Sequence, residues 1–256
     1  MELGLNDKVA IVTGSSRGIG RSIALGFADE KCHLSLCARG EEQLILTEQE
    51  VARKGVDTIA TVGDLTTAEG INRVVDVTLK KWGRIDILIN NVGGSVWNPF
   101  VEVSDEEWLH VFNLNMFAAV RATRAVLPTM LKQESGSIIT ISSIFGREAG
   151  GPATYNATKA AEISMGKTLA KEVANKGIRV NTVAPGSVIF PGGNWQKRLD
   201  ADPEGIGNFV KQELPVGRFG RPEEIADVVV FLSSDRGSWV TGACINVDGC
   251  QSRSLI

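Results

Sequence analysis

The stretch TGSSRGIG at residues 13–20 decides how the start of this chain folds. It follows the apolar run VAIV at residues 9–12, and an amphipathic segment of helix length comes directly after it. Gly14, Gly18 and Gly20 allow a tight turn and a close approach of another molecule to the backbone. The N-terminus of the following helix would add unpaired amide N–H groups and a positive dipole end, which favour a pyrophosphate. The stretch therefore predicts a dinucleotide-binding strand–turn–helix unit, with a tight connection that binds nothing as the alternative.

The same alternation of strand-like and helix-like segments continues along the chain. Nearly continuous apolar, β-branched runs are typical of strands buried on both faces of a parallel sheet. The alternation predicts a single-domain α/β fold of the Rossmann type, doubly wound, with a seven-stranded, mostly parallel sheet and helices on both faces. The six further strand-like runs cover residues 34–37, 58–62, 85–89, 137–141, 178–183 and 243–247, and the helix-like segments include residues 21–31, 40–54 and 68–82.

No linker, repeat or change in composition divides the chain, so residues 1–256 are predicted to form one Rossmann domain. The stretch 190–221 is irregular and rich in Gly and Pro. We interpret it as an insertion that forms a mobile loop beside a substrate.

The composition is that of an ordinary globular protein. Twenty-seven basic and 30 acidic residues give a formal charge of −3, so nothing in the charge favours nucleic acid as a partner. Apolar runs stay far below the roughly 20 residues that span a bilayer, and no leader-like segment opens the chain, so we expect a cytoplasmic protein without membrane contact. The four cysteines and two histidines lack metal-binding spacing, so no metal is expected. The cysteines are interpreted as reduced core or interface residues.

Four motifs in a fixed order resemble the short-chain dehydrogenase/reductase family. They are TGSSRGIG at residues 13–20, NNVG at 90–93, SSIFG at 142–146 and YNATK at 155–159, and the resemblance extends from about Lys8 to Gly249. It implies an NAD(P)-binding Rossmann domain and an oxidoreductase that acts on CH–OH groups. The general run of the chain is similar to 3-oxoacyl-[acyl-carrier-protein] reductase-like members of the family.

Tyr155 is the only tyrosine of the chain, and Lys159 follows four residues later, so both side chains can share one helix face. An isolated phenol loses its proton at about pH 10, and a nearby ammonium favours the phenolate. Such a pair can donate a proton to a forming alkoxide or accept one in reverse. The resemblance implies that Tyr155 is the proton donor and that Lys159 tunes it and holds the cofactor ribose.

The resemblance also implies a serine that orients the substrate carbonyl and an asparagine that holds a water in the proton relay. The usual sequence distance to the tyrosine favours Ser142. The local match of SSIFG to the family motif favours Ser143, and it requires that one residue is deleted between Gly146 and Tyr155. Adjacent strand residues point to opposite faces, so only one of the two serines can serve, and we choose Ser143. Asn113 and Asn115 compete for the water, and the frame of the following helix favours Asn115.

The end of the second predicted strand favours NADP over NAD. An acidic residue there binds the ribose hydroxyls of NAD, whereas an arginine accommodates the 2′-phosphate of NADP. Arg39 stands at this position, Arg17 can add a second cation, and Glu41 and Glu42 weaken the preference, so we expect NADPH with NAD as the alternative. Together, the turn and the resemblance imply the following cofactor-binding residues: Gly14, Ser16, Arg17, Gly18, Ile19, Gly20, Arg39, Asp64, Leu65, Asn91, Gly93, Tyr155, Lys159, Pro185, Gly186 and Val188.

The predicted reaction is hydride transfer between a nicotinamide and a carbonyl or secondary alcohol, with a 3-oxoacyl thioester or similar ketone as the favoured substrate. A sugar, polyol or other secondary-alcohol dehydrogenase that uses NAD(H) is the alternative. A non-catalytic dinucleotide-binding subunit is less favoured, because it has no use for Tyr155 and Lys159.

Several large side chains are candidates for the substrate mouth, namely Trp97, Trp195, Lys197 and Arg198, and Phe190 stands where family members often carry threonine. The resemblance further implies a homotetramer. Its contacts would involve helices over residues 116–131 and 153–173 and the tail 244–256.

Overall fold

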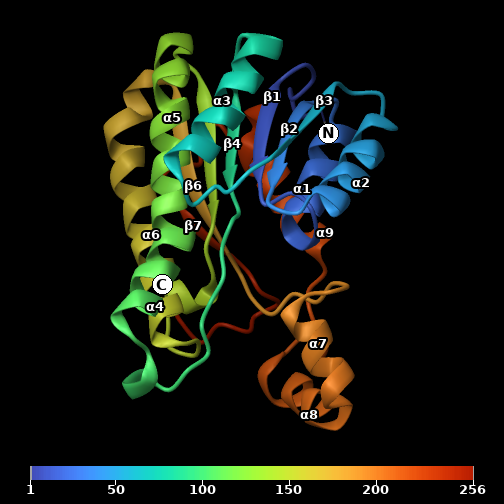
Figure 1. Ribbon diagram of the computed structural model, residues 1–256, viewed down its shortest axis with the longest axis vertical. Helices are drawn as coiled ribbons and strands as arrows, with labels where there is room; N and C mark the ends of the chain where they lie inside the picture. The colour runs from blue at the N-terminus through green and yellow to red at the C-terminus, as the bar shows by residue number, and fades with distance from the viewer. Residues whose placement is uncertain (1, 256) are drawn as a thin grey trace.

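A parallel sheet forms the centre of the molecule (Figure 1). The computed structural model describes residues 2–255, so residues 1 and 256 of the predicted domain and tail lie outside the described range. Within that range, the sheet has seven strands in the order β3-β2-β1-β4-β5-β6-β7, and each neighbouring pair is parallel. This order confirms the doubly wound Rossmann-type fold. The strands are β1 Val9–Thr13, β2 His33–Ala38, β3 Thr58–Val62, β4 Ile87–Asn90, β5 Gly136–Ile141, β6 Ile178–Pro185 and β7 Cys244–Val247.

Helices cover both faces of the sheet. One buried cluster joins the sheet to α1, α2 and α9, and a second joins its other face to α3, α5 and α6. The bounds are α1 Gly18–Asp29, α2 Glu41–Ala52, α3 Ala68–Trp82, α5 Ala118–Gln133, α6 Ala153–Val173 and α9 Pro222–Ser233. Three further helices, α4 Asp105–Phe112, α7 Asn194–Ala201 and α8 Pro203–Glu213, lie beyond the sheet, at the lower end of Figure 1.

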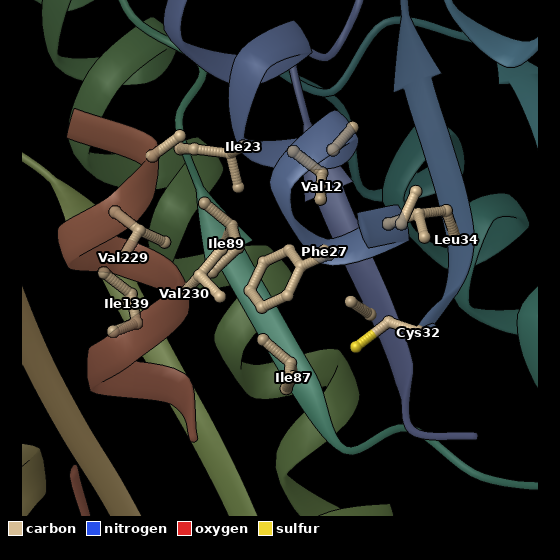
Figure 2. Packing of buried hydrophobic residues seen from close by; sticks show 14 of the residues in the cluster. Val12, Ile23, Phe27, Cys32, Leu34, Ile87, Ile89, Ile139, Val229 and Val230 are labelled. Carbon is tan, nitrogen blue, oxygen red and sulfur yellow. The ribbon is translucent and has the colours of Figure 1, made fainter. Parts of the chain in front are cut away.

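The two cores follow from the alternation of side chains along each strand. Ala10 and Val12 of β1 belong to one cluster, whereas Ile11 between them belongs to the other. Figure 2 shows the first core, where Phe27 of α1 packs among Ile87 and Ile89 of β4 and neighbouring side chains. Apolar side chains are therefore needed on both faces, which is why the strand sequences are almost wholly apolar.

The strand order reverses direction at β1, which lies between β2 and β4. In open α/β sheets, ligands bind at such a switch point, outside the carboxyl ends of the strands. Here that edge carries the glycine turn after β1, Asn91 after β4 and Ser143 after β5. The fold alone thus gathers distant motifs at one rim.

Hydrogen bonds of Asp86 and Arg179 stabilise the opposite edge of the sheet. Asp86, only 5% exposed, accepts hydrogen bonds from the Val9 amide (2.9 Å) and from Arg84 Nε (2.9 Å) and Nη2 (2.7 Å). Arg179 near the start of β6 donates to backbone carbonyls of the segment that follows α9, including those of Gly237 (3.0 Å) and Ser234 (3.1 Å). These contacts fix the amino ends of strands β1, β4 and β6, which lie far from the predicted site.

The stretch 190–221 corrects one expectation. It is not an irregular loop, because α7 and α8 occupy most of it. Pro203 stands in the first turn of α8, and Asp202 caps the helix by accepting a hydrogen bond from the Gly205 amide (2.9 Å). Pro and Gly therefore mark helix boundaries here rather than disorder. The long helix α6 has the predicted bounds 153–173, whereas α5 starts at Ala118 instead of residue 116.

The cysteines are free, as expected, but not all of them are core residues. Cys32 and Cys37 are buried, Cys244 is half-buried and Cys250 is exposed, so Cys250 is not a core residue and its place at an interface stays a prediction. Over residues 2–255, no helix combines the length and apolar character needed to cross a membrane. The same residues contain no group of three or more potential metal ligands.

Candidate active site

The glycine turn is too tight for side chains. Gly14 has φ +66° and Gly18 has φ +55°, both in the left-handed region that favours glycine. A Cβ on Gly20 would lie 2.3 Å from the carbonyl oxygen of Gly14. Because α1 begins at Gly18, the unpaired amide N–H groups of its first turn lie at the turn itself. This is the helix N-terminus that the sequence predicted for a pyrophosphate.

Asn91 holds this turn in place. Its Nδ2 donates to the carbonyl oxygens of Thr13 (3.0 Å) and Gly14 (3.2 Å), and its backbone N–H donates to the Thr13 hydroxyl (2.8 Å). The Asn91 side chain, which was predicted to bind the cofactor, thus holds the loop after β1 against the loop after β4.

A cleft of about 540 Å³ opens beside the turn. Ala38 and Arg39 at the end of β2, Arg17 of the turn and Asp64 after β3 line it. Thr66 donates to the Asp64 carboxylate from its backbone N–H (2.9 Å) and its hydroxyl (2.8 Å), and these bonds, helped by the charge of Arg39, lower the pKa of Asp64. The cleft can therefore hold an adenosine beside an acid that stays charged.

The residues of this cleft fit a 2′-phosphate. Two exposed arginines, Arg17 and Arg39, line it, and no acidic residue ends β2. Among the described lining residues is Gln43, but neither Glu41 nor Glu42. The two glutamates lie in the first turn of α2, where the helix dipole stabilises their charge.

A second cleft of about 550 Å³ contains Ser143, Tyr155 and Lys159. The last residue of β6, Pro185, and Gly186 and Val188 of the segment after it also line this cleft. Both clefts are lined by Ile19, Asn91, Gly93, Phe190 and Asn194, so they join into one crevice along the rim of the sheet. Of the predicted site residues, only Gly18 and the fully buried Asn115 are not among the described lining residues of either cleft.

The two candidate serines have different partners. The Ser142 hydroxyl donates to the backbone carbonyl of Lys159 (2.9 Å), which fastens β5 to α6. The Ser143 oxygen accepts a hydrogen bond from the Phe145 amide (3.1 Å), which leaves its proton available for a substrate. The geometry therefore favours Ser143 as the residue that contacts a carbonyl.

The two candidate asparagines also differ. Asn115 lies in a π-turn at Asn113–Phe117, and its amide exchanges hydrogen bonds with the backbone of Gly94 (2.8 and 2.9 Å). It also donates to Thr158 (3.1 Å) on α6, whereas the Asn113 side chain accepts a hydrogen bond from Arg121 (2.8 Å). Asn115 is thus the one that connects the loop after β4 to α6, and a π-turn is a common device at functional sites.

Lys159 has a partner that sequence reasoning missed. Its Nζ donates to Glu162 Oε2 (2.9 Å) and Oε1 (3.1 Å) and to the Ile141 carbonyl (2.9 Å), and it lies 5.6 Å from the centre of the Tyr155 ring. Burial alone would lower the pKa of Lys159, but the charges of Glu162 and Tyr155 and the bonds to Glu162 raise it overall. The signal was present in the sequence, because a residue three positions on in a helix lies on the same face.

The mouth of the second cleft is aromatic and cationic. The Arg198 guanidinium lies 4.7 Å from the Trp97 ring centre and 5.2 Å from that of Trp195. Trp195 in turn stacks on Phe209 of α8 at 4.6 Å. The tryptophans that sequence analysis placed at the mouth therefore meet around one arginine.

Phe190 and Val188 shape the inner wall. A Cβ on Gly18 would lie 2.6 Å from the Phe190 ring, so this ring covers the glycine turn. Val188 forms a β-bridge with Gly220 that uses the Ser187 carbonyl (2.9 Å) and the Ile189 amide (3.0 Å). In such a bridge the amide and carbonyl of Val188 itself point to the other side, so they are available to a bound cofactor, in keeping with the predicted role of Val188.

Comparisons with known proteins agree with this geometry. A family profile described as Enoyl-(Acyl carrier protein) reductase matches residues 14–250. The chain is 39% identical to 3-oxoacyl-[acyl-carrier-protein] reductase FabG of Thermotoga maritima over 248 residues. This alignment covers 96% of this chain and 98% of the relative. It is 36% identical to 3-oxoacyl-[acyl-carrier-protein] reductase of Synechocystis sp., with 96% and 97% covered.

A solved structure of similar shape is L-sorbose reductase from Gluconobacter frateurii complexed with NADPH and L-sorbose. Its TM-score is 0.94 at 35% sequence identity, and 100% of both chains is covered. The chain therefore belongs to the short-chain dehydrogenase/reductase family. It is an oxidoreductase of that family, and it carries the four motifs in order on the fold that its sequence predicted.

Proposed function

We propose that this chain is an NADP(H)-dependent ketoreductase that reduces the 3-oxo group of an acyl thioester. One observation carries the proposal: Ser143, Tyr155 and Lys159 line one cleft, which continues into a second cleft with two arginines. A dinucleotide with a 2′-phosphate would lie along this crevice, held by the glycine turn, Arg17 and Arg39 at one end and by residues 185–188 at the other.

The side chains of the second cleft have complementary roles in the proposed reaction. When bound, the cofactor supplies the hydride. Ser143 donates a hydrogen bond to the substrate carbonyl oxygen, and Tyr155 gives this oxygen its proton as negative charge develops. The buried Lys159 ammonium stabilises the phenolate that remains, and Asn115 supports the loop backbone and holds the relay water.

The substrate assignment is supported by the relatives named as 3-oxoacyl-[acyl-carrier-protein] reductases. Lys197 and Arg198 line the second cleft and offer cations to an anionic carrier. A sugar or polyol is the second candidate, because the structurally similar reductase was solved with L-sorbose and because the exposed Trp97 ring offers a flat surface to a sugar.

A homotetramer in the cytoplasm is part of the proposal. Large apolar side chains are exposed in and beside α4 and at the start of α5, namely Phe100, Val101, Leu109 and Phe117. Such a cluster is typical of a protein–protein contact. Four free cysteines are also compatible with a reducing compartment. Sedimentation of a monomer at micromolar concentration would contradict the assembly.

The test is the decay of NADPH absorbance with acetoacetyl-CoA and with L-sorbose, each with the wild type and Tyr155→Phe. We expect decay with acetoacetyl-CoA and a loss of kcat of about 10²–10⁴-fold in the variant, because the proton donor is removed. The Kd for NADPH should change by less than about twofold, since the phenol contributes little to the phosphate contacts. Decay with L-sorbose alone would move the assignment to a sugar, and full turnover of Tyr155→Phe would refute the mechanism.

A further inference from the structure

A buried carboxylate accompanies the catalytic lysine. Glu162 is 1% exposed, lies one helical turn after Lys159 on α6, and accepts hydrogen bonds from its Nζ with both oxygens, at 2.9 and 3.1 Å. The third bond of the ammonium goes to the Ile141 carbonyl. All three donor positions of Lys159 are thus directed to its own chain, and two of them meet this carboxylate.

The other surroundings of Glu162 are uncharged. It lines a cavity of about 10 Å³, room for one water, together with Thr13, Asn90 and apolar side chains of α3, α5 and nearby loops. The described residues of α3, α5, β4 and the nearby loops that line this cavity carry no charge, so the only charged group that acts on Glu162 is Lys159 of its own helix. Burial raises the pKa of Glu162, and the Lys159 ammonium opposes this rise. A carboxylate in this place costs stability unless the ammonium compensates it, which indicates a role beyond packing.

We infer that Glu162 is a positioning residue: its carboxylate holds the Lys159 ammonium in place and offsets the positive charge that Lys159 presents to Tyr155. The inference rests on the proposed roles of Tyr155 and Lys159 in proton transfer. The ammonium favours the phenolate form of Tyr155, and a carboxylate in contact with the same ammonium reduces this effect. Glu162 therefore sets the pH at which the Tyr155–Lys159 pair releases a proton.

The single tyrosine of the chain makes this testable without turnover. The ¹³Cζ resonance of labelled tyrosine reports the ionisation of Tyr155 alone in the intact protein. We expect its pH midpoint to fall by about one unit in Glu162→Gln, which keeps the size of the side chain and removes its charge. The pH midpoint of NADP-dependent alcohol oxidation should fall in parallel. In a Lys159→Met background the same substitution should leave the resonance midpoint unchanged, because the effect acts through the ammonium.

Asp86→Asn is the matched control. It removes another buried carboxylate of an ion pair, at the opposite edge of the sheet, and should lower the melting temperature without moving the tyrosine midpoint. A midpoint in folded Glu162→Gln that stays within about 0.2 units of wild type, or rises, overturns the inference. Since the resonance requires no substrate, a wild type without ketoreductase activity would refute the proposed function and leave this measurement intact.

Discussion

The hydroxyl of Ser142 and the backbone carbonyl of Lys159 are joined by a buried hydrogen bond of 2.9 Å. This bond links the end of β5 to the helix that carries Tyr155 and Lys159. Ser142, the serine at the usual distance from the tyrosine, donates this bond. The hydroxyl of the next residue, Ser143, makes no such bond to α6 and lines the cleft. We therefore expect Ser142 to support the site and Ser143 to contact a substrate.

Alanine substitutions should separate these two tasks. Ser143→Ala should lower kcat by about 10²–10³-fold, because one donor to the developing negative charge is lost. Ser142→Ala should leave kcat within about threefold but lower the free energy of unfolding by about 1 kcal/mol, since it deletes one buried hydrogen bond. Steady-state rates and urea unfolding of both variants provide the measurement. The reverse pattern would assign catalysis to Ser142.

Arg39→Ala should discriminate between the two dinucleotides. Losing a charge-assisted bond to the 2′-phosphate costs about 1.5–3 kcal/mol, which raises the Kd for NADPH about 10- to 150-fold. The Kd for NADH should change little, because NADH lacks this phosphate. Fluorescence titration with both cofactors measures the difference, and Arg53→Ala at the far end of α2 serves as a surface-charge control. Equal losses for NADH and NADPH would show that Arg39 does not recognise the phosphate.

Glu224 should make stability depend on acid pH. Hydrogen bonds from the Arg218 guanidinium (2.6 and 2.9 Å) and from the Arg221 amide (2.8 Å) lower its pKa to about 2. A depressed pKa stabilises the fold at pH values above the ordinary value of about 4.3, and this contribution is lost as the pH falls toward 2.

Glu224→Gln should therefore melt below wild type at pH 7, and the gap should close as the pH approaches 2. The pair is partly exposed, so we expect a difference of only about 0.5–1 kcal/mol, or about 1–4 °C. Thermal scans across pH 2–7 measure this, with Glu69→Gln in the first turn of α3 as a control for the helix dipole alone. A gap that persists unchanged at the lowest pH would contradict the assignment.

The sheet could be predicted from the sequence because its central strands are buried on both faces. Runs such as residues 137–141 have no polar face, and this pattern leaves little choice between strand and surface helix. The glycine turn was equally clear, since Gly14 and Gly20 leave no room for a side chain. These features depend on local chemistry, which the sequence displays directly.

Other features depend on contacts between distant residues and could not be predicted in this way. Helix α8 was hidden by its boundary residues, because Asp202 and Pro203 are typical of turns as well as of helix starts. Glu162 has the spacing of an ordinary solvent-exposed helix charge, and only the position of α6 on the sheet, beside residues 113–117, shows that it is buried. The partners of Ser142 and Asn115 likewise become visible only when the helix is placed on the sheet.

The Arg84–Asp86 pair and the carbonyl contacts of Arg179 lie at one edge of the sheet, and Tyr155 lies at the other. The contacts that stabilise the fold and the side chains proposed to react are consequently located in different parts of one domain. Substitutions around the substrate mouth can change which substrate the enzyme recognises, while the contacts of Asp86 and Arg179 stay unchanged. A lineage that carries this arrangement can thus acquire new specificities by small steps, without having to evolve a new way to stay folded.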